Sequence, residues 1–386
     1  MTKIGGGLAR KLTKFSALAV SLVALAACEP GALNTGRSGG KAQVALLVPA
    51  GSADPNVAFL AQNLTNAAKL AVSDLEGTSI DLRVYDTAGD ASQAAAVARS
   101  AVSEGADVIV GPLFAEAANA VGNAVAGTNT AVLSFSNNSD VAGGNVFVLG
   151  ATFDNTARRL MGYAKSKGIS SVMVVNGQTT AEEVGRDAIV RAAQDYGLRV
   201  AGTESFAMSQ EGVVAAAPGI VANTQTSGAN AIFLTSNTDT ALPIVTQLLP
   251  EQGLTPDSIQ YIGLTRWDVP ASALSLPGVQ GGWFTIPDTQ AMSQFNARYT
   301  TAFGAAPHGI AGLGYDGVAA VAALAQAGQA PTPANMTQSR GFAGASGVFR
   351  FPQGGGNQRA LSVATIENKA VRVLDSAPKS FGSAGF

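Results

Sequence analysis

Apolar positions along the chain form short unbroken runs that alternate with longer stretches of helical periodicity. Residues 44–48 are an all-apolar run that ends at Pro49, which is typical of a parallel strand buried on both faces. Across residues 58–75 the apolar side chains recur at helical spacing. A second strand is expected at 80–85, ahead of an Ala-rich helical stretch that stops at Gly105. This pattern predicts repeated strand–helix units.

The same alternation is present twice and predicts two open, doubly wound α/β lobes with right-handed crossovers. The first set has strands at 44–48, 80–85, 108–110, 131–134 and 146–149, with helices at 58–75, 91–104 and 115–126. The second set has strands at 171–175, 199–206, 229–234 and 260–264, with helices at 155–167, 181–196 and 241–249.

The last hundred residues break this alternation. Helices are expected at 289–303 and 314–329, and antiparallel strands at 347–351, 359–367 and 370–374. The chain is therefore expected to cross between lobes near Gly150, near 286–288 and near 331–334. This places residues 42–150 plus about 289–332 in lobe 1, and residues 151–288 plus about 333–386 in lobe 2.

The N-terminus has the features of an export signal. Four basic residues, with no acidic one, precede an apolar run at 15–27 that is shorter than the roughly 20 residues of a membrane span. The following Leu25-Ala26-Ala27-Cys28 resembles the lipobox of bacterial lipoproteins, and Cys28 is the only cysteine. We expect residues 1–27 to be removed, Cys28 to carry lipid, and the Gly-rich residues 28–41 to form a flexible tether.

This lipobox resemblance also bears on location and partners. Glu29 is not the Asp that retains such lipoproteins in the inner membrane, so we expect anchoring to the outer membrane, facing the periplasm. The four basic residues of the leader leave 20 of the 24 basic residues, against 26 acidic ones, in the remainder. A mildly acidic chain with scattered charge argues against a nucleic-acid partner.

Enzyme chemistry has little support in the sequence. His308 is the only histidine, so a zinc site of the usual kind is not expected, and no Gly-x-Ser-x-Gly elbow is present. Residues 312–317 match the Gly-x-Gly-x-x-Gly dinucleotide fingerprint, but they precede an Ala-rich helix late in the chain, which favours close helix packing. We expect a non-catalytic protein without a metal or cofactor other than the covalent lipid.

The loops after the predicted strands are rich in Ser, Thr and Asn. Ligands bind beyond the carboxyl ends of strands in open α/β sheets, so these side chains are candidates for contact with a polar ligand. The same residue types also cap the helices that follow, and the pattern alone leaves both interpretations open. The candidate cleft residues are Ser52, Leu113, Phe114, Ser134, Ser136, Asn137, Asn176, Thr235, Trp267 and Tyr315, with Phe135 as a further aromatic wall.

Two exported α/β lobes with several crossings resemble the type I periplasmic binding protein fold, which is also called leucine-binding-protein-like. The order of VALLVP at 44–49, RVYDT at 83–87, GADVIVGPL at 105–113, NVFVLG at 145–150 and GASG at 344–347 resembles the penicillin-binding protein activator (LppC-type) lipoproteins. Those are outer-membrane lipoproteins that help to switch on peptidoglycan synthases. The N-terminal helical-repeat region of the longer family members has no counterpart in this chain.

The resemblance implies two functions. The first is activation of a peptidoglycan synthase, a penicillin-binding protein, as partner. The alternative is a lipoprotein receptor of an ABC importer for an amino acid or related small polar ligand. Amino-acid-binding members hold the ligand with a hydroxyl residue just after the third strand and with residues after the fourth. Here Phe114-Ala115-Glu116 has no hydroxyl at the first position, whereas residues 134–138 are polar. A sensory or scaffolding protein without a ligand is a third hypothesis.

Overall fold

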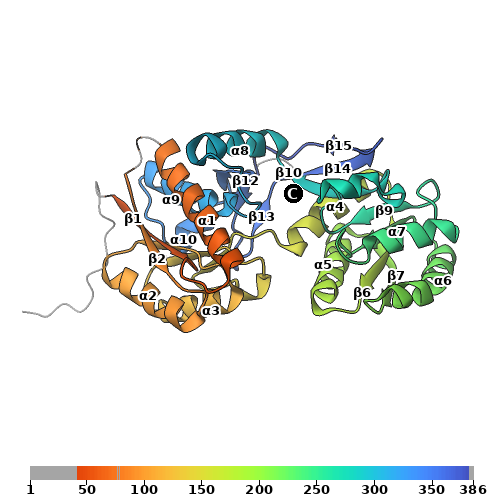
Figure 1. The fold of residues 1–386 in the computed structure, drawn as a ribbon, viewed down its shortest axis with the longest axis horizontal. Helices are drawn as coiled ribbons and strands as arrows, with labels where there is room; N and C mark the ends of the chain where they lie inside the picture. Colours follow the sequence, from red (N-terminus) through yellow and green to blue (C-terminus); the bar gives the residue numbers. More distant parts are fainter. Residues whose placement is uncertain (1–40, 76, 78, 382–386) are drawn as a thin grey trace, which may run out of the picture. The chain divides into compact units, whose positions relative to one another are not determined.

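The computed structural model describes residues 41–75, 77 and 79–381. The expected signal segment, Cys28 and nearly all of the expected tether lie outside these residues. Two α/β lobes, each with helices on both faces of its main sheet, make up the described part and confirm the expected fold class (Figure 1).

A five-stranded parallel sheet forms the centre of lobe 1, with the strand order β2-β1-β3-β4-β5. The sheet is buried on both faces at its centre because β3 and β4 are almost unbroken aliphatic runs. Its strands are β1 (Ala42–Val48), β2 (Ile80–Asp86), β3 (Val108–Val110), β4 (Ala131–Ser134) and β5 (Val146–Val148).

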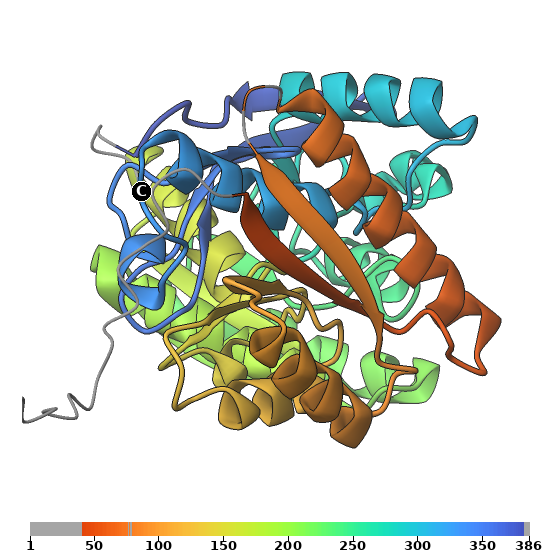
Figure 2. The same cartoon turned by 90° about the vertical axis from the view of Figure 1, so that its left-hand side faces the viewer.

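Helices cover both faces of this sheet, as Figure 2 shows for α1 on one side of β1 and β2 and for α2 and α3 on the other. Asp54 caps α1 by accepting a hydrogen bond from the Asn56 N–H, and Pro55 occupies the first turn. The first face has α1 (Pro55–Asp74) and α9 (Gly312–Gln326), with α8 (Thr289–Phe303) and α10 (Pro333–Met336) in the same apolar cluster, and the second has α2 (Ala91–Ser103) and α3 (Ala115–Ala124).

The glycines of the 312–317 motif serve close packing. A Cβ atom on Gly314 would lie 2.2 Å from the backbone oxygen of Leu64 in α1, and one on Gly317 would lie 2.4 Å from a methyl group of Val110 in β3. Helix α9 therefore approaches both α1 and the sheet more closely than larger residues would allow. This agrees with the packing interpretation of the motif.

A seven-stranded mixed sheet forms the centre of lobe 2, in the order β15-β14-β10-β9-β8-β6-β7. The strands from β10 to β7 are parallel, and β14 and β15 extend the sheet as antiparallel neighbours. The strands are β6 (Ser171–Gly177), β7 (Arg199–Phe206), β8 (Ala231–Leu234), β9 (Gln260–Gly263), β10 (Trp283–Pro287), β14 (Leu361–Glu367) and β15 (Ala370–Asp375).

The helices of lobe 2 also divide between two faces. One apolar cluster joins the sheet to α4 (Phe153–Ser166) and α5 (Thr180–Tyr196), and the other joins it to α6 (Gln210–Ser227) and α7 (Leu242–Glu251). The expected elements omit α6 and β10. Pro218 lies inside α6 and weakens its helical signal, because proline removes an N–H donor and normally interrupts a helix.

The C-terminal part corrects one expected boundary. A small antiparallel sheet of β11 (Phe342–Gly344), β12 (Gly347–Arg350) and β13 (Gln358–Arg359) follows α10. Met336, Phe342 and Phe349 belong to the apolar cluster of lobe 1, so residues 333–359 do not start lobe 2. The third crossing therefore lies between β13 and β14 and not near 331–334, because the Phe-rich strands complete the lobe 1 core.

Candidate functional site

The candidate site is built from the loops at the carboxyl ends of the parallel strands, where open α/β sheets bind ligands. In lobe 1 these loops are residues 49–54, 87–90, 111–116 and 135–138, which we call the lobe 1 edge. In lobe 2 they are residues 177–182, 207–209, 235–239 and 264–270, which we call the lobe 2 edge.

Asp86, at the end of β2, fixes two loops of the lobe 1 edge. Its Oδ1 atom accepts hydrogen bonds from the N–H groups of Gly51 and Ala88, both at 2.8 Å. A Cβ atom on Gly51 would lie 2.3 Å from Asp86 Oδ2, so glycine lets this loop and the carboxylate lie close together. Ala88 and Gly89 both have positive φ, 49° and 82°, which places a strained alanine in the turn after β2.

An aromatic ring and a hydroxyl lie together at this edge. A Cβ atom on Gly89 would lie 3.5 Å from the ring of Phe114 and 3.9 Å from the Oγ atom of Ser52. The Phe114 side chain is 39% exposed, which is unusual for a ring of its size. Ser52 Oγ accepts a hydrogen bond from the Asp54 N–H at 3.2 Å, which leaves its own proton available as a donor. These two predicted residues are thus brought together.

The first turn of α3 is the least satisfied helix start in the described part of the chain. Phe114 occupies the N-cap position, and no side chain caps the helix. The N–H groups of Ala115 and Glu116 have no acceptor among the described residues. Such groups, together with the helix dipole, favour an anion at this end of a helix. The only charged residue of the turn is Glu116.

Most other helix starts have a side-chain cap that accepts one N–H group of the first turn, although their first one or two N–H groups also have no acceptor among the described residues. A Ser, Thr or Asp side chain caps α1, α2, α4, α5, α6 and α8. Helix α7 has no side-chain cap, but the carbonyl groups of Asn237 and Ala241 accept the N–H groups of Leu242 and Ile244. Helix α9 also has no side-chain cap, but the carbonyl groups of Ile310 and Ala311 accept the N–H groups of Leu313 and Gly314. The start of α3 differs in having neither a side-chain cap nor a backbone acceptor for its first three N–H groups.

Most of the predicted residues after β3 and β4 are buried or bonded within their loops and do not face outward. Ser134 is fully buried; its hydroxyl donates to the Pro112 carbonyl at 3.1 Å and accepts from the Ser136 N–H at 3.1 Å. The Oγ atom of Ser136, which is also buried, accepts from the Asn138 N–H at 3.1 Å. Leu113 is partly buried and packs against the lobe 1 core, whereas Asn137 is exposed.

Glu182 organises the lobe 2 edge and is a residue that the sequence interpretation missed. Its Oε2 atom accepts from the Gly177 N–H at 2.5 Å, from the Thr235 hydroxyl at 2.7 Å and from the Ser236 hydroxyl at 3.3 Å. Thr179 caps α5 by accepting from the Glu182 N–H at 3.3 Å. The Thr-x-x-Glu spacing typical of a capping box was a signal for this carboxylate.

The predicted polar residues of lobe 2 are buried and already paired. Thr235 is 4% exposed and Asn176 is 2% exposed. The amide of Asn176 donates to the Gly177 carbonyl at 2.9 Å, and the Thr235 hydroxyl is bonded to Glu182. Exposed apolar side chains stand at this edge instead, namely Met208 and Val269. These two side chains were not expected at the site, because apolar residues beside a strand normally lie in the core.

The expectation of aromatic walls is wrong for three of the four rings. Phe135 is 3% exposed and lies in the lobe 1 core. Trp267 is fully buried, because glycines at 263 and 282 make room for its ring, which stacks on Phe284 with centroids 6.4 Å apart. Tyr315 packs in α9 against Phe295 and donates to Asp74 at 3.3 Å.

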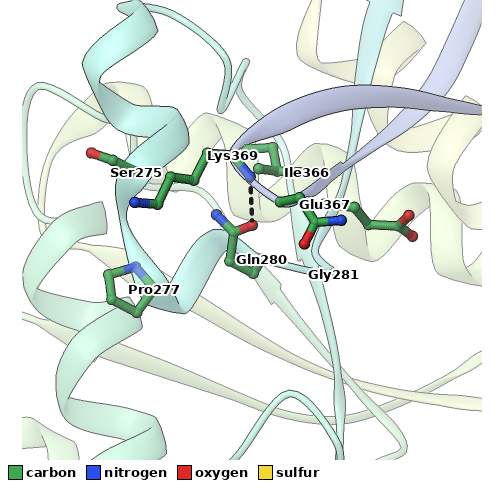
Figure 3. A pocket seen from close by; sticks show the side chains of 8 residues that line it. Ser275, Pro277, Gln280, Gly281, Ile366, Glu367 and Lys369 are labelled. Carbon is green, nitrogen blue, oxygen red and sulfur yellow. Dashed lines mark hydrogen bonds between the residues drawn. The ribbon is translucent and has the colours of Figure 1, made fainter.

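An open surface cavity with a volume of about 560 Å³ lies elsewhere in lobe 2 (Figure 3). It lies at the amino end of β10, where Gly281 precedes the strand and where the hairpin between β14 and β15 turns. That is the sheet end opposite to the lobe 2 edge, and no predicted site residue lines the cavity. Its lining residues are Ser275, Pro277, Gln280, Gly281, Ile366, Glu367, Asn368 and Lys369.

Among the described residues, no group of three or more His, Cys, Asp or Glu side chains is placed to hold a metal ion. Within the same part of the chain, no helix is both long and apolar enough to cross a membrane.

Comparisons with known proteins agree with this architecture. The family model for periplasmic binding proteins matches residues 42–370. A solved structure described as a branched-chain amino acid ABC transporter from Rhodospirillum rubrum is 18% identical, with a TM-score of 0.73 over 86% of this chain and 100% of that chain. A search of curated proteins found no match.

Two solved structures at lower similarity contain ligands. The branched-chain amino acid transporter substrate-binding protein from Streptococcus pneumoniae, in complex with isoleucine, is 15% identical with a TM-score of 0.54, covering 87% of this chain and 99% of that one. A solute-binding protein of an ABC transporter from R. palustris, in complex with benzoate, is 17% identical with a TM-score of 0.54, covering 90% and 99%. At these identities the likeness is one of fold.

Proposed function

The chain belongs to the periplasmic binding protein family, and from this premise we propose that it is an extracytoplasmic receptor that binds a small compound carrying a carboxylate. The family is generally one of non-catalytic binding and transport proteins. The proposal includes the lipid anchor on Cys28 and delivery of the compound to an ABC importer. It therefore favours the second of the two functions expected from the sequence.

The observation that carries the proposal is the start of α3. The open N–H groups of Ala115 and Glu116 suit a carboxylate, which a helix N-terminus attracts through its N–H groups and dipole. The exposed ring of Phe114 beside them suits an apolar body. Isoleucine and benzoate, which the two liganded relatives in fold contain, share a carboxylate on an apolar body.

The absent hydroxyl after β3 refines the ligand class. A hydroxyl there would offer one more hydrogen bond, and Phe114 in its place offers a ring. The apolar side chains Met208 and Val269 at the lobe 2 edge suit contact with an apolar body as well. We therefore favour a carboxylate with an aromatic or branched aliphatic body over a ligand recognised mainly through many polar groups.

A thermal-shift panel tests this proposal on the purified full chain. Isoleucine and benzoate are compared with isoleucinol and benzyl alcohol, which keep the body and lack the carboxylate. A ligand present at a hundred times its Kd adds about 2.7 kcal/mol to the free energy of unfolding. We expect at least one carboxylate to raise the Tm and its matched alcohol to leave it unchanged. Equal shifts for both members of each pair, or none, contradict the proposal.

Activation of a peptidoglycan synthase is the second candidate. It is favoured by the sequence stretches that resemble LppC-type lipoproteins and by the paired state of Asn176, Glu182 and Thr235, whose polar atoms are used within lobe 2. A pull-down from solubilised envelope separates the candidates. Enrichment of a penicillin-binding protein, together with a flat thermal-shift panel, would favour this function over the receptor.

A further inference from the structure

The polypeptide passes between the lobes three times, and one buried arginine connects these passages. Arg359, the last residue of β13, stands directly before the third crossing. Its Nε and Nη2 atoms donate to the carbonyl of Leu149, at the start of the first crossing, at 3.0 and 2.7 Å. Its Nη1 atom donates to Asp316 at 2.6 Å and to the Ser346 hydroxyl at 3.2 Å.

The second crossing joins the same network through Ser346. The backbone carbonyl of Ser346 accepts from the N–H of Asp288, which lies between β10 and α8, at 3.1 Å. Asn357 adds a second tie between the first and third crossings, because its amide donates to the carbonyl groups of Val148, at 3.0 Å, and of Gly150. All three crossings are therefore connected within a few residues of Arg359.

Because the Arg359–Asp316 pair is buried, its hydrogen bonds can form in only one arrangement of the groups around it. The two side chains are 6% and 1% exposed, and the other oxygen of Asp316 accepts from the Ala345 N–H at 2.6 Å. Burial raises the pKa of Asp316 above its ordinary value, and the adjacent guanidinium opposes that rise. A buried pair of this kind adds little net stability over an apolar pair, but each of its donors needs an acceptor at a fixed place.

The backbone of Arg359 contacts lobe 2 at one side chain. Its N–H donates to Asn155 Oδ1 at 2.9 Å, and its carbonyl accepts from Asn155 Nδ2 at 3.2 Å. Asn155 lies in the first turn of α4 and is buried. The guanidinium is thus held by lobe 1 and the first crossing, whereas the peptide groups of the same residue are held by lobe 2.

We propose that Asp316 and Arg359 are positioning residues that clamp the three crossings together on lobe 1. Together with Leu149 and Ser346, they form what we call the crossing clamp. Any change in the arrangement of the lobes then takes place between the clamp and lobe 2, in the few residues that follow Leu149 and Arg359 and that precede Asp288. The clamp proposal depends on the proposed function in one respect, namely that a bound ligand would shift the arrangement of the lobes.

Hydrogen exchange of the full chain without ligand, followed by mass spectrometry, tests the clamp. The reporters are the bonded N–H groups of Gly150, Asp288 and Arg359, one from each crossing. We expect Arg359→Lys to speed exchange at all three by at least tenfold, because lysine cannot reach three acceptors in a fixed geometry. Exchange in β8, at the centre of the lobe 2 sheet, should not change.

Three further variants keep the test decisive. Asp316→Asn retains an acceptor for the Ala345 N–H and should give the same pattern of faster exchange more weakly. It provides the test if Arg359→Lys fails to fold. Ser346→Ala should speed exchange at Asp288 more than at Gly150. Arg372→Lys, which alters the exposed pair with Glu367, is the matched control and should change none of the reporters.

The pattern of exchange distinguishes the clamp from a local or merely stabilising role of Arg359. Faster exchange confined to β11–β13, or a uniform rise that includes β8, would overturn the proposal, because a local or merely stabilising role predicts those patterns. Since no ligand is present, a flat thermal-shift panel would leave this test unaffected, and a failed clamp would leave the receptor proposal in place.

Discussion

The two sheet edges start from the same sequence chemistry and end in different states. Both follow buried parallel strands with polar residues, and both place a glutamate in the first turn of a helix. In lobe 2, Thr179 caps the helix and Glu182 folds back onto Thr235. In lobe 1, Phe114 stands at the cap position, so the helix start stays open and the ring is exposed. A polar residue after a strand is thus available to a ligand only where the loop itself does not use it.

The largest expected difference between the edges concerns their aromatic rings. Trp267→Ala should lower the free energy of unfolding by about 3–5 kcal/mol, because it empties a buried, tightly packed site. Phe114→Ala should lower this free energy by less than about 1 kcal/mol, because the ring is partly exposed. The same change should weaken carboxylate binding at least tenfold, because the apolar body of the ligand loses its contact with the ring. Urea unfolding and calorimetric titration measure the two quantities. Similar unfolding losses for both variants would remove the contrast between the edges.

The two glutamates give the next largest difference. Glu182→Ala leaves a buried N–H group and two hydroxyls without their acceptor, and should lower the free energy of unfolding by about 2–3 kcal/mol. Glu116→Ala is the matched control, with a loss below about 1 kcal/mol. Removing the Glu116 charge should also tighten binding of a carboxylate several-fold. Weaker binding after Glu116→Ala would place the carboxylate elsewhere.

The smallest expected effect comes from the strained turn of the lobe 1 edge. Ala88→Gly should raise the free energy of unfolding by about 0.5–1 kcal/mol, because glycine relieves the cost of a positive φ and this gain exceeds its added chain entropy. Ala207→Gly, in the lobe 2 edge where φ is not positive, should lower it by about the same amount. A loss in both variants would show that the lobe 1 turn is not strained.

Much of the fold could be predicted because its strands are short aliphatic runs such as Val108–Val110, and its helices begin at cap residues and end at glycines such as Gly197. Helix α6 was missed because Pro218 masks its period. Strand β12, which holds Phe349, lies in lobe 1 and not in lobe 2 as expected, since apolar periodicity shows that a segment is buried but not which core buries it.

The candidate site was less predictable for a related reason. The sequence placed Ser52 and Phe114 at the same edge, and the structure brings them together. It equally selected Trp267 and Tyr315, because a buried ring and an exposed ring look alike in a sequence. Glu182 and Arg359 act through partners 53 and 43 residues away, Thr235 and Asp316, and no local pattern encodes such long-range pairs.

The most direct test is a crystal structure of the full chain with the carboxylate that gives the largest thermal shift. The account predicts that a carboxylate oxygen lies about 3 Å from the backbone nitrogen of Ala115 or Glu116, with the apolar body against the ring of Phe114. A ligand seated in the cavity beside Lys369, or one whose carboxylate makes no contact with the first turn of α3, would contradict it.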